Sequence, residues 1–141
     1  MRVEPIFRAW RRDDLPSVRG SHTWVARSDE GAIVGFADAG PSRDTDSELS
    51  CAELYTLHVA PGLRGTGAGS ALLSSVIDGL RRGGFLKVTA WVLESNEKAR
   101  RFYEKRGWRW DGQTLSEQIG SARLSEVRYA SVPIRIGPAS V

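Results

Sequence analysis

Hydrophobic residues recur along the chain at spacings that predict alternating strands and helices. Between residues 72 and 80, leucine, valine and isoleucine share one helical face, and Gly83 and Gly84 then provide a stop. The flanking segments 52–59 and 85–93 are rich in apolar and β-branched residues and are predicted to be strands. Both alternating sets of 52–59 are largely apolar, so this central strand is expected to be covered on both faces. Because a helix separates the two strands, we expect them to be parallel and joined by a right-handed crossover.

Weaker signals precede this unit. Apolar residues share one face over 6–15, which predicts a helix of about ten residues. The β-rich segments 23–27 and 32–39 are joined by the polar residues 28–31, a connection typical of a hairpin. Residues 41–50 are polar and predict a loop.

A second helix and more β-rich sequence follow the unit. Ser95 or Asn96 is placed to cap this helix, and Gly107 is placed to end it. The β-rich stretches 108–110 and 124–133 flank a polar loop. The elements together predict an α/β fold with a mixed, mainly antiparallel sheet flanked by helices.

The composition is that of a soluble protein with one domain, residues 1–141. Hydrophobic residues make up 40% and charged residues 26%, and no apolar run is long enough for a membrane helix or a signal peptide. We therefore expect a cytoplasmic location and no membrane partner. The single cysteine, Cys51, excludes an internal disulfide, and with only His22 and His58 as histidines no metal is expected. The net charge of +3 is interleaved with acids, which favours a solvated surface over nucleic-acid binding, although it would suit a polyanionic small molecule.

A glycine-rich stretch follows the strand at 52–59. Gly65, Gly67 and Gly69 alternate strictly at a strand-to-helix junction, where backbone N–H groups and the helix dipole favour an anion such as a phosphate. A Walker loop would end in Gly-Lys-Ser/Thr, and the dinucleotide motif needs Gly-x-Gly-x-x-Gly, so ATP and NAD are poor candidates. Taken alone, the glycines are also compatible with a tight turn and close helix packing.

Two ordered motifs decide between these alternatives. The glycine stretch resembles motif A of the GNAT superfamily of acyl-CoA-dependent N-acyltransferases, through the run Val59-x-Pro61-x-x-Arg64-Gly65-x-Gly67-x-Gly69. Some forty residues later, a second stretch resembles that family's second coenzyme-binding segment, through Asn96-x-x-Ala99-x-x-Phe102-Tyr103-Glu104-Lys105-x-Gly107-Trp108. The stretch Glu126-Val127-Arg128-Tyr129 is similar to the closing strand of many members.

The resemblance implies a GNAT-like sheet whose parallel strand pair is splayed at an acetyl-CoA site. It implies an acetyltransferase that moves the acetyl group to an amine by direct attack in a ternary complex. The acceptor is an amine-bearing small molecule, protein or peptide. The coenzyme-binding positions that it implies are Leu57, His58, Val59, Arg64, Gly65, Thr66, Gly67, Ala68, Gly69, Ser70 and Asn96.

The chain departs from the family at its beginning. The family has a strand and two helices before its hairpin, whereas only 22 residues precede Thr23. We therefore expect the N-terminal strand and first helix to be absent, with 6–15 matching the family's second helix. The strand at Thr23 would then have an open edge, so either Met1 is not the natural start or another chain, as in a homodimer, covers that edge.

The chemistry requires a base and a proton donor. An alkyl amine with a pKa of about 10.4 is almost wholly charged at neutral pH and must lose a proton before it attacks. The resemblance places that base at Glu53 and assigns donation to the leaving thiolate to Tyr103. Glu94 is a weaker substitute for the base. The carboxylates that could instead line the acceptor entrance are Asp44, Asp46 and Glu48.

Other assignments remain as alternatives. Cys51 could form an acyl-enzyme, but no histidine has the required sequence context and direct transfer needs no nucleophile. His58 is better interpreted as packed or hydrogen-bonded on its strand than as the base. Trp91 could contact an acceptor if its side chain points into the cleft. The alternative from a different functional class is a regulatory module that binds acyl-CoA without catalysing a reaction.

Overall fold

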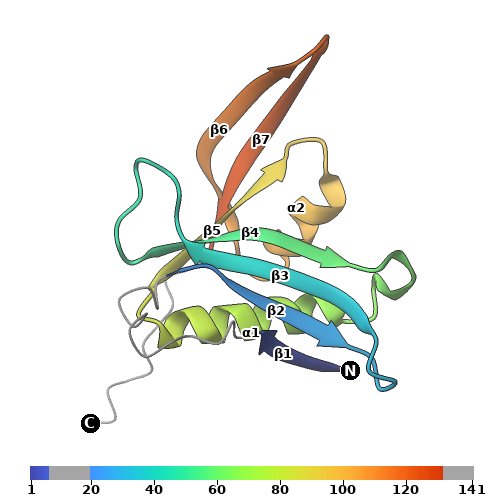
Figure 1. Cartoon of the computed structure of the whole chain (residues 1–141). Coiled ribbons are helices and arrows are strands. Elements are labelled where there is room, and N and C mark those ends of the chain that lie inside the picture. The colour runs from blue at the N-terminus through green and yellow to red at the C-terminus, as the bar shows by residue number, and fades with distance from the viewer. Residues whose placement is uncertain (7–19, 132–141) are drawn as a thin grey trace.

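The computed structural model describes residues 1–6 and 20–131, whose strands form one mixed sheet (Figure 1). The strand order is β1-β2-β3-β4-β5-β7-β6, and every neighbouring pair is antiparallel except β4 and β5. No described helix is both long and apolar enough to cross a membrane. The elements are β1 Arg2–Ile6, β2 His22–Arg27, β3 Ile33–Pro41, β4 Cys51–Val59, the 3-10 turn η2 Pro61–Leu63, α1 Ala68–Arg82, β5 Lys87–Leu93, α2 Glu97–Glu104, β6 Arg109–Ile119 and β7 Ala122–Ala130.

Strands β4 and β5 are paired only where they begin. Their parallel ladder runs from Cys51 opposite Lys87 to Glu53 opposite Thr89. Beyond that point β4 continues towards the loop before α1, whereas β5 turns away towards α2 (Figure 1). The predicted parallel pair is therefore confirmed, and its strands separate after Glu53 and Thr89.

A β-bulge at Tyr55 interrupts the alternation of β4. Leu54 and Thr56 pair with neighbouring residues of β3, which leaves Tyr55 as the extra residue. Leu54 lies in the core before the bulge, and Leu57 packs against the core after it. The expectation that this strand is covered on both faces is wrong at its end, because Thr56 and His58 are exposed.

Helix α1 lies across one face of β2, β3 and β4 (Figure 1). Its predicted apolar stripe is buried through Leu72, Leu73, Val76 and Leu80. The strands beneath it carry fully buried alanines, whose small side chains allow the helix to approach closely. These are Ala26, Ala37, Ala39 and Ala52.

The N-terminal strand that we expected to be absent is present. Strand β1 pairs with β2 from Arg2 opposite Arg27 to Ile6 opposite Thr23. The expectation is therefore corrected, and the strand at Thr23 is not an open edge that a second copy must cover. The predicted helix over 6–15 is wrong at its first residue, since Ile6 belongs to β1, and from residue 7 onward it lies outside the described residues.

The polar loop predicted between residues 110 and 124 is instead a long β-hairpin. Strands β6 and β7 turn at Gly120, whose positive φ of 61° suits a tight turn. Every residue of β6 is exposed, and the hairpin projects away from the rest of the sheet (Figure 1). Since neither face of β6 is buried, its sequence lacks the apolar alternation by which a strand is predicted.

The substitution Gly79→Ala tests the packing of α1 on β2. At an open helical position this change stabilises a protein by about 1 kcal/mol. Here the added Cβ would lie 2.8 Å from Cζ2 of Trp24. We therefore expect the free energy of unfolding, measured with urea, to fall by about 1–3 kcal/mol. In Gly62→Ala, where the added Cβ meets nothing within 4 Å, it should change by less than about 0.5 kcal/mol. A stabilised Gly79→Ala protein would contradict this packing.

Candidate functional site

A pocket lies where β4 and β5 have separated. It has a volume of about 530 Å³ and is bounded by the end of β4, the loop before α1, the first turn of α1, and α2. Figure 1 shows these segments at the same end of the molecule. The lining residues are Leu57, His58, Val59, Leu63, Arg64, Gly65, Gly67, Gly69, Ser70, Asn96, Lys98, Ala99, Phe102, Tyr103 and Arg106.

Most residues selected from the sequence meet in this pocket. All the coenzyme-binding positions that the resemblance implied line it except Thr66 and Ala68, and so does Tyr103. Thr66 donates its hydroxyl to the carbonyl of Leu63, and Ala68 is buried as the first residue of α1. Both residues nevertheless adjoin lining residues, because Thr66 lies between Gly65 and Gly67 and Ala68 between Gly67 and Gly69. Glu53 does not line the pocket.

The loop before α1 combines glycines of positive φ with an uncapped helix start. Gly65 and Gly67 have φ values of 83° and 91°, which glycine adopts readily and other residues rarely do. Gly67 is the N-cap of α1 and offers no side-chain cap, and the first turn contains no acid. The first N–H groups of any α-helix have no intrahelical acceptor, and in this 15-residue helix no capping side chain accepts from them either. The helix dipole adds positive potential at the same place.

Three cations line the pocket without a carboxylate among the described residues. They are Arg64 from the loop, and Lys98 and Arg106 from α2 and its C-terminal flank. Arg106 stacks its guanidinium 3.7 Å from the ring centre of Phe102 and donates from Nη1 to the Phe102 carbonyl at 2.7 Å. Its Nε is buried and has no hydrogen-bond partner among the residues that the structure describes. An unpaired buried donor beside an uncapped helix fits a polyanionic ligand such as coenzyme A.

The sequence analysis did not identify Lys98 or Arg106 as binding residues. The available signal was their spacing, because Lys98, Phe102 and Arg106 are each four residues apart and so share one side of α2. Phe102 contacts the start of α1, since a Cβ on Gly69 would lie 3.3 Å from its ring. This stripe therefore faces the glycine loop.

Tyr103 is the only buried side chain of α2, and it is 6% exposed. Its ring packs against Phe102, Trp108 and Tyr129, with ring centres 5.1 to 6.0 Å apart. Burial raises the pKa of Tyr103 to about 12. The phenol is therefore neutral at physiological pH and can donate a hydrogen bond into the pocket.

Polar contacts hold α2 against β7 behind this phenol. The hydroxyl of Tyr129 donates to Oε1 of Glu104 at 2.6 Å and accepts from Nε of Arg100 at 3.0 Å. At the other end of the helix, Oδ1 of Asn96 accepts from the N–H of Ala99 at 3.1 Å. Asn96 thus caps α2 with its side-chain oxygen.

Glu53 lies on the other face of the sheet. Ala52 and Leu54 belong to the core, so the side chain between them points away from that core. Glu53 is 2% exposed and accepts two hydrogen bonds from Arg43, from its backbone N–H at 3.0 Å and from Nη2 at 2.8 Å. The hydrogen bond to Glu53 raises the pKa of Arg43. Glu53 and Tyr103 thus lie on opposite faces of the sheet. Glu53 itself is the last residue of β4 that pairs with β5.

A buried arginine organises this face, and the sequence analysis did not single it out. Arg128 of β7 is 9% exposed and donates to Asp46 at 2.8 and 2.9 Å, to Asp44 at 3.1 Å, and to Asp111. The indole of Trp91 also donates to Asp44, at 3.0 Å. These bonds fix the loop between β3 and β4, and the hydrogen bond from Arg128 lowers the pKa of Asp46.

The remaining candidates are placed as follows. Glu48 and Glu94 are exposed, and neither lines the pocket. Burial raises the pKa of the Cys51 thiol, which makes its reactive thiolate scarcer. His58 is exposed, and its ring centre lies 5.7 Å from that of Phe36. Within residues 1–6 and 20–131, no three histidine, cysteine or acidic side chains are grouped to hold a metal ion.

The sequence model of the acetyltransferase (GNAT) family matches residues 2–108. This chain belongs to the GNAT acetyltransferase family. An uncharacterized N-acetyltransferase of Mycobacterium tuberculosis H37Rv is 40% identical over 97 residues, which cover 69% of this chain and 58% of the relative. An uncharacterized N-acetyltransferase of Bacillus subtilis 168 is 33% identical over 121 residues, which cover 84% of this chain and 64% of the relative. The chain therefore spans less than two thirds of the length of either relative.

A solved structure from Streptococcus mutans UA159 has the same fold. It matches 96% of this chain and 100% of its own, with a TM-score of 0.72 at 20% identity. The GNAT resemblance stated from the two motifs is confirmed. The residues matched by the GNAT family model include every residue that lines the pocket, whereas all of β6 and β7 lies beyond them.

The ionisation of Tyr103 tests its burial in this GNAT pocket. An exposed tyrosine has a pKa of about 10, whereas that of Tyr103 is raised to about 12. The phenolic proton of Tyr103 dissociates at a higher pH in the folded protein than in the unfolded chain. Its contribution to the free energy of unfolding is therefore complete below about pH 10 and is lost as the pH rises through about 12. Across that interval, denaturant unfolding should show a smaller loss of stability in Tyr103→Phe than in the wild type. A phenolate absorbance that is lost in Tyr103→Phe and has its midpoint near pH 10 in the wild type would contradict the burial.

Proposed function

We propose that this chain is an acetyl-CoA-dependent N-acetyltransferase that transfers the acetyl group directly to an amine. The observation that carries the proposal is one pocket that combines an uncapped glycine-rich helix start, three cations without an acid among the described residues, and the buried phenol of Tyr103. The first two features suit the phosphates of a coenzyme, and the third suits the thiolate that it releases. Membership of the GNAT family supports the same activity.

The exposed backbone of β4 supports coenzyme binding beside the glycine loop. The N–H of Ala60 donates to Val34 of β3 at 2.9 Å. Because successive N–H groups of a strand alternate in direction, the N–H of Val59 points away from β3, to the side where β5 has departed. We assign the pantetheine arm to this edge and to Asn96. The N–H of Val59 would hydrogen-bond the thioester oxygen and polarise its carbonyl.

Acetyl-CoA supplies the acetyl group as an activated thioester. Tyr103 would stabilise the departing thiolate as a neutral hydrogen-bond donor. Its pKa of about 12 lies above the value near 8.5 of a thiol, so complete transfer of the phenolic proton to sulfur is uphill by about 3 to 4 pKa units. Tyr103 would therefore act through the fixed dipole of its O–H group, which stabilises the negative charge that develops on the sulfur. Because the side chain is buried, few water molecules compete for this hydrogen bond.

We assign the proton from the amine to Glu53. The carboxylate lies on the face opposite α1, at the last paired position before β4 and β5 separate. An amine on that face would reach the thioester through the separation between the strands. The two hydrogen bonds from Arg43 hold the carboxylate in one orientation, and a water molecule would carry the proton to it.

Coenzyme binding and turnover test this proposal together. Calorimetric titration with acetyl-CoA should show saturable binding, and a panel of amines should include one that releases free thiol. Tyr103→Phe should lower kcat by about 10²- to 10⁴-fold, because it removes a donor used in the transition state, and leave the Kd for acetyl-CoA within about threefold. Absence of coenzyme binding would refute the proposal. Binding without thiol release from any amine, in both proteins, would instead identify a regulatory acyl-CoA-binding module.

A pair of matched substitutions tests the assignment of the base. Glu53→Gln keeps the size of the side chain but removes its capacity to accept a proton, so kcat/KM for the amine should fall by about 10²-fold or more. The control Glu94→Gln, at an exposed site outside the pocket, should leave kcat/KM within about twofold. Equal losses in both variants, or a loss in Glu94→Gln alone, would remove Glu53 from this role.

A further inference from the structure

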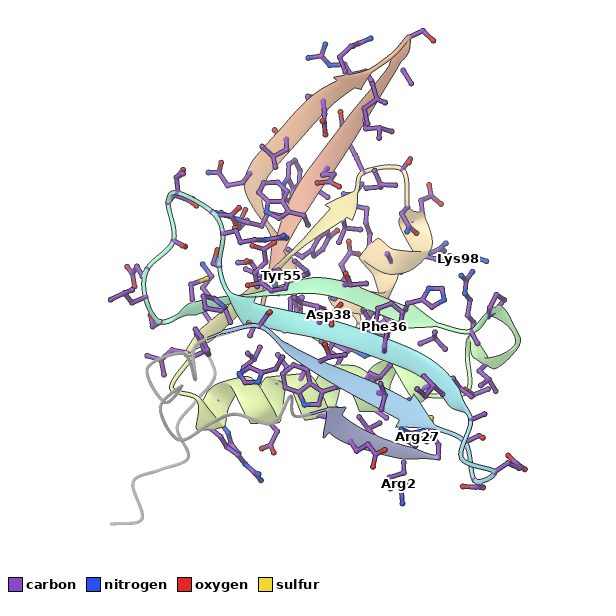
Figure 2. All side chains as sticks on the ribbon, viewed as in Figure 1. Arg2, Arg27, Phe36, Asp38, Tyr55 and Lys98 are labelled. Carbon is purple, nitrogen blue, oxygen red and sulfur yellow. The ribbon has the colours of Figure 1, made fainter. Side chains whose placement is uncertain are left out.

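Helix α2 contributes to the pocket a positive side chain that no ion pair among the described residues holds. Lys98 lies in the first turn of α2 and lines the pocket. Figure 2 labels Lys98 on α2, at the end of the molecule that carries the loop before α1. None of the ion pairs among residues 1–6 and 20–131 involves Lys98.

The other two cations of the pocket have other assignments. Arg64 is exposed like Lys98, but it flanks the glycine loop, whose backbone N–H groups suit the pyrophosphate of a coenzyme. Arg106 holds the carbonyl and ring of Phe102, and so helps to fix the C-terminal end of α2. Lys98 is exposed, and within the described part of the chain its side chain belongs to no ion pair. Its charge is therefore free for a ligand.

Coenzyme A carries two separate anionic groups. Its pyrophosphate is a diester that backbone N–H groups can cradle, whereas the phosphate on its ribose is a monoester with a charge of about −2 at neutral pH. A compact ammonium on a flexible stem suits such a terminal phosphate, because it can approach from many directions as a point charge.

We propose that Lys98 binds the terminal phosphate monoester of the coenzyme and makes this site select coenzyme A over its dephosphorylated form. The proposal rests on the proposed function, since it needs the pocket to bind the coenzyme. Lys98 follows Asn96 by two residues and lies four residues before Phe102, so the stripe that faces the glycine loop begins with this charge. Selection against the dephosphorylated form arises because that form leaves the ammonium unpaired.

Lys105 provides a matched control. It is a lysine at the other end of α2, it is exposed, and it does not line the pocket. Lys98→Ala and Lys105→Ala therefore remove the same charge from the same helix, but only Lys98→Ala removes it from the pocket. Lys98→Arg keeps the charge and tests for rescue.

The experiment measures the Kd of wild type and variants by calorimetry, with acetyl-CoA and with acetyl-3′-dephospho-CoA as the two probes. The wild type and Lys105→Ala should bind acetyl-CoA about 5- to 20-fold more tightly than the dephosphorylated probe. In Lys98→Ala this ratio should fall to within about twofold, through weaker binding of acetyl-CoA alone, and Lys98→Arg should restore most of it. Added salt should reduce the ratio in the wild type and leave it unchanged in Lys98→Ala.

The outcomes separate this proposal from the proposed function. If neither probe binds the wild type, the proposed function fails, and the role of Lys98 fails with it. If both probes bind the wild type equally, or if Lys98→Ala keeps the full ratio, the role of Lys98 is overturned while coenzyme binding stands. Equal weakening of both probes in Lys98→Ala would also overturn it, because the lysine would then act on a part of the coenzyme that the two probes share.

Discussion

The separation of β4 from β5 after three paired positions is the constraint on which the rest of the structure depends. A strand in the middle of a sheet normally satisfies its backbone groups on both sides, whereas the second half of β4 pairs only with β3. The bulge at Tyr55 and the pairing of β5 with β7 maintain this separation. It exposes strand backbone towards the pocket on the α1 face and places Glu53 next to the separation on the opposite face.

The sequence was sufficient to predict the parts of the fold whose structure is set by residues close to one another along the chain. The stripe of α1 and the apolar strands on either side of it predict a strand–helix–strand unit with parallel strands. Parallel strands place the loops that follow them at the same end of the sheet. The loop that follows β4 and the helix that follows β5 therefore meet, which is why the glycines at 65–69, Asn96 and Tyr103 could be assigned to one site from two motifs.

The remaining features arise from contacts that a local pattern does not contain. The sequence pattern predicts regular alternation of the two faces of β4 through Leu54, Tyr55 and Thr56. It therefore gives no sign of the bulge or of the exposed end of the strand. Strand β6 buries no side chain, and its pairing with β7 is set by backbone hydrogen bonds and a turn at Gly120. Arg128 contacts Asp44 and Asp46 across 84 and 82 residues of sequence, a distance at which charge patterning gives no indication of a partner.

These long-range bonds of Arg128 have a consequence for the order in which the molecule is assembled. The residues that line the pocket lie between Leu57 and Arg106, but α2, which forms one wall of the pocket, is held by Tyr129 of β7. The loop between β3 and β4, although it is made earlier, lacks its arginine until β7 has left the ribosome. Both faces of the sheet therefore wait for the last described strand. A truncation between Trp110 and Arg128 would keep the residues that line the pocket, but it would remove Tyr129 from behind α2 and Arg128 from the loop.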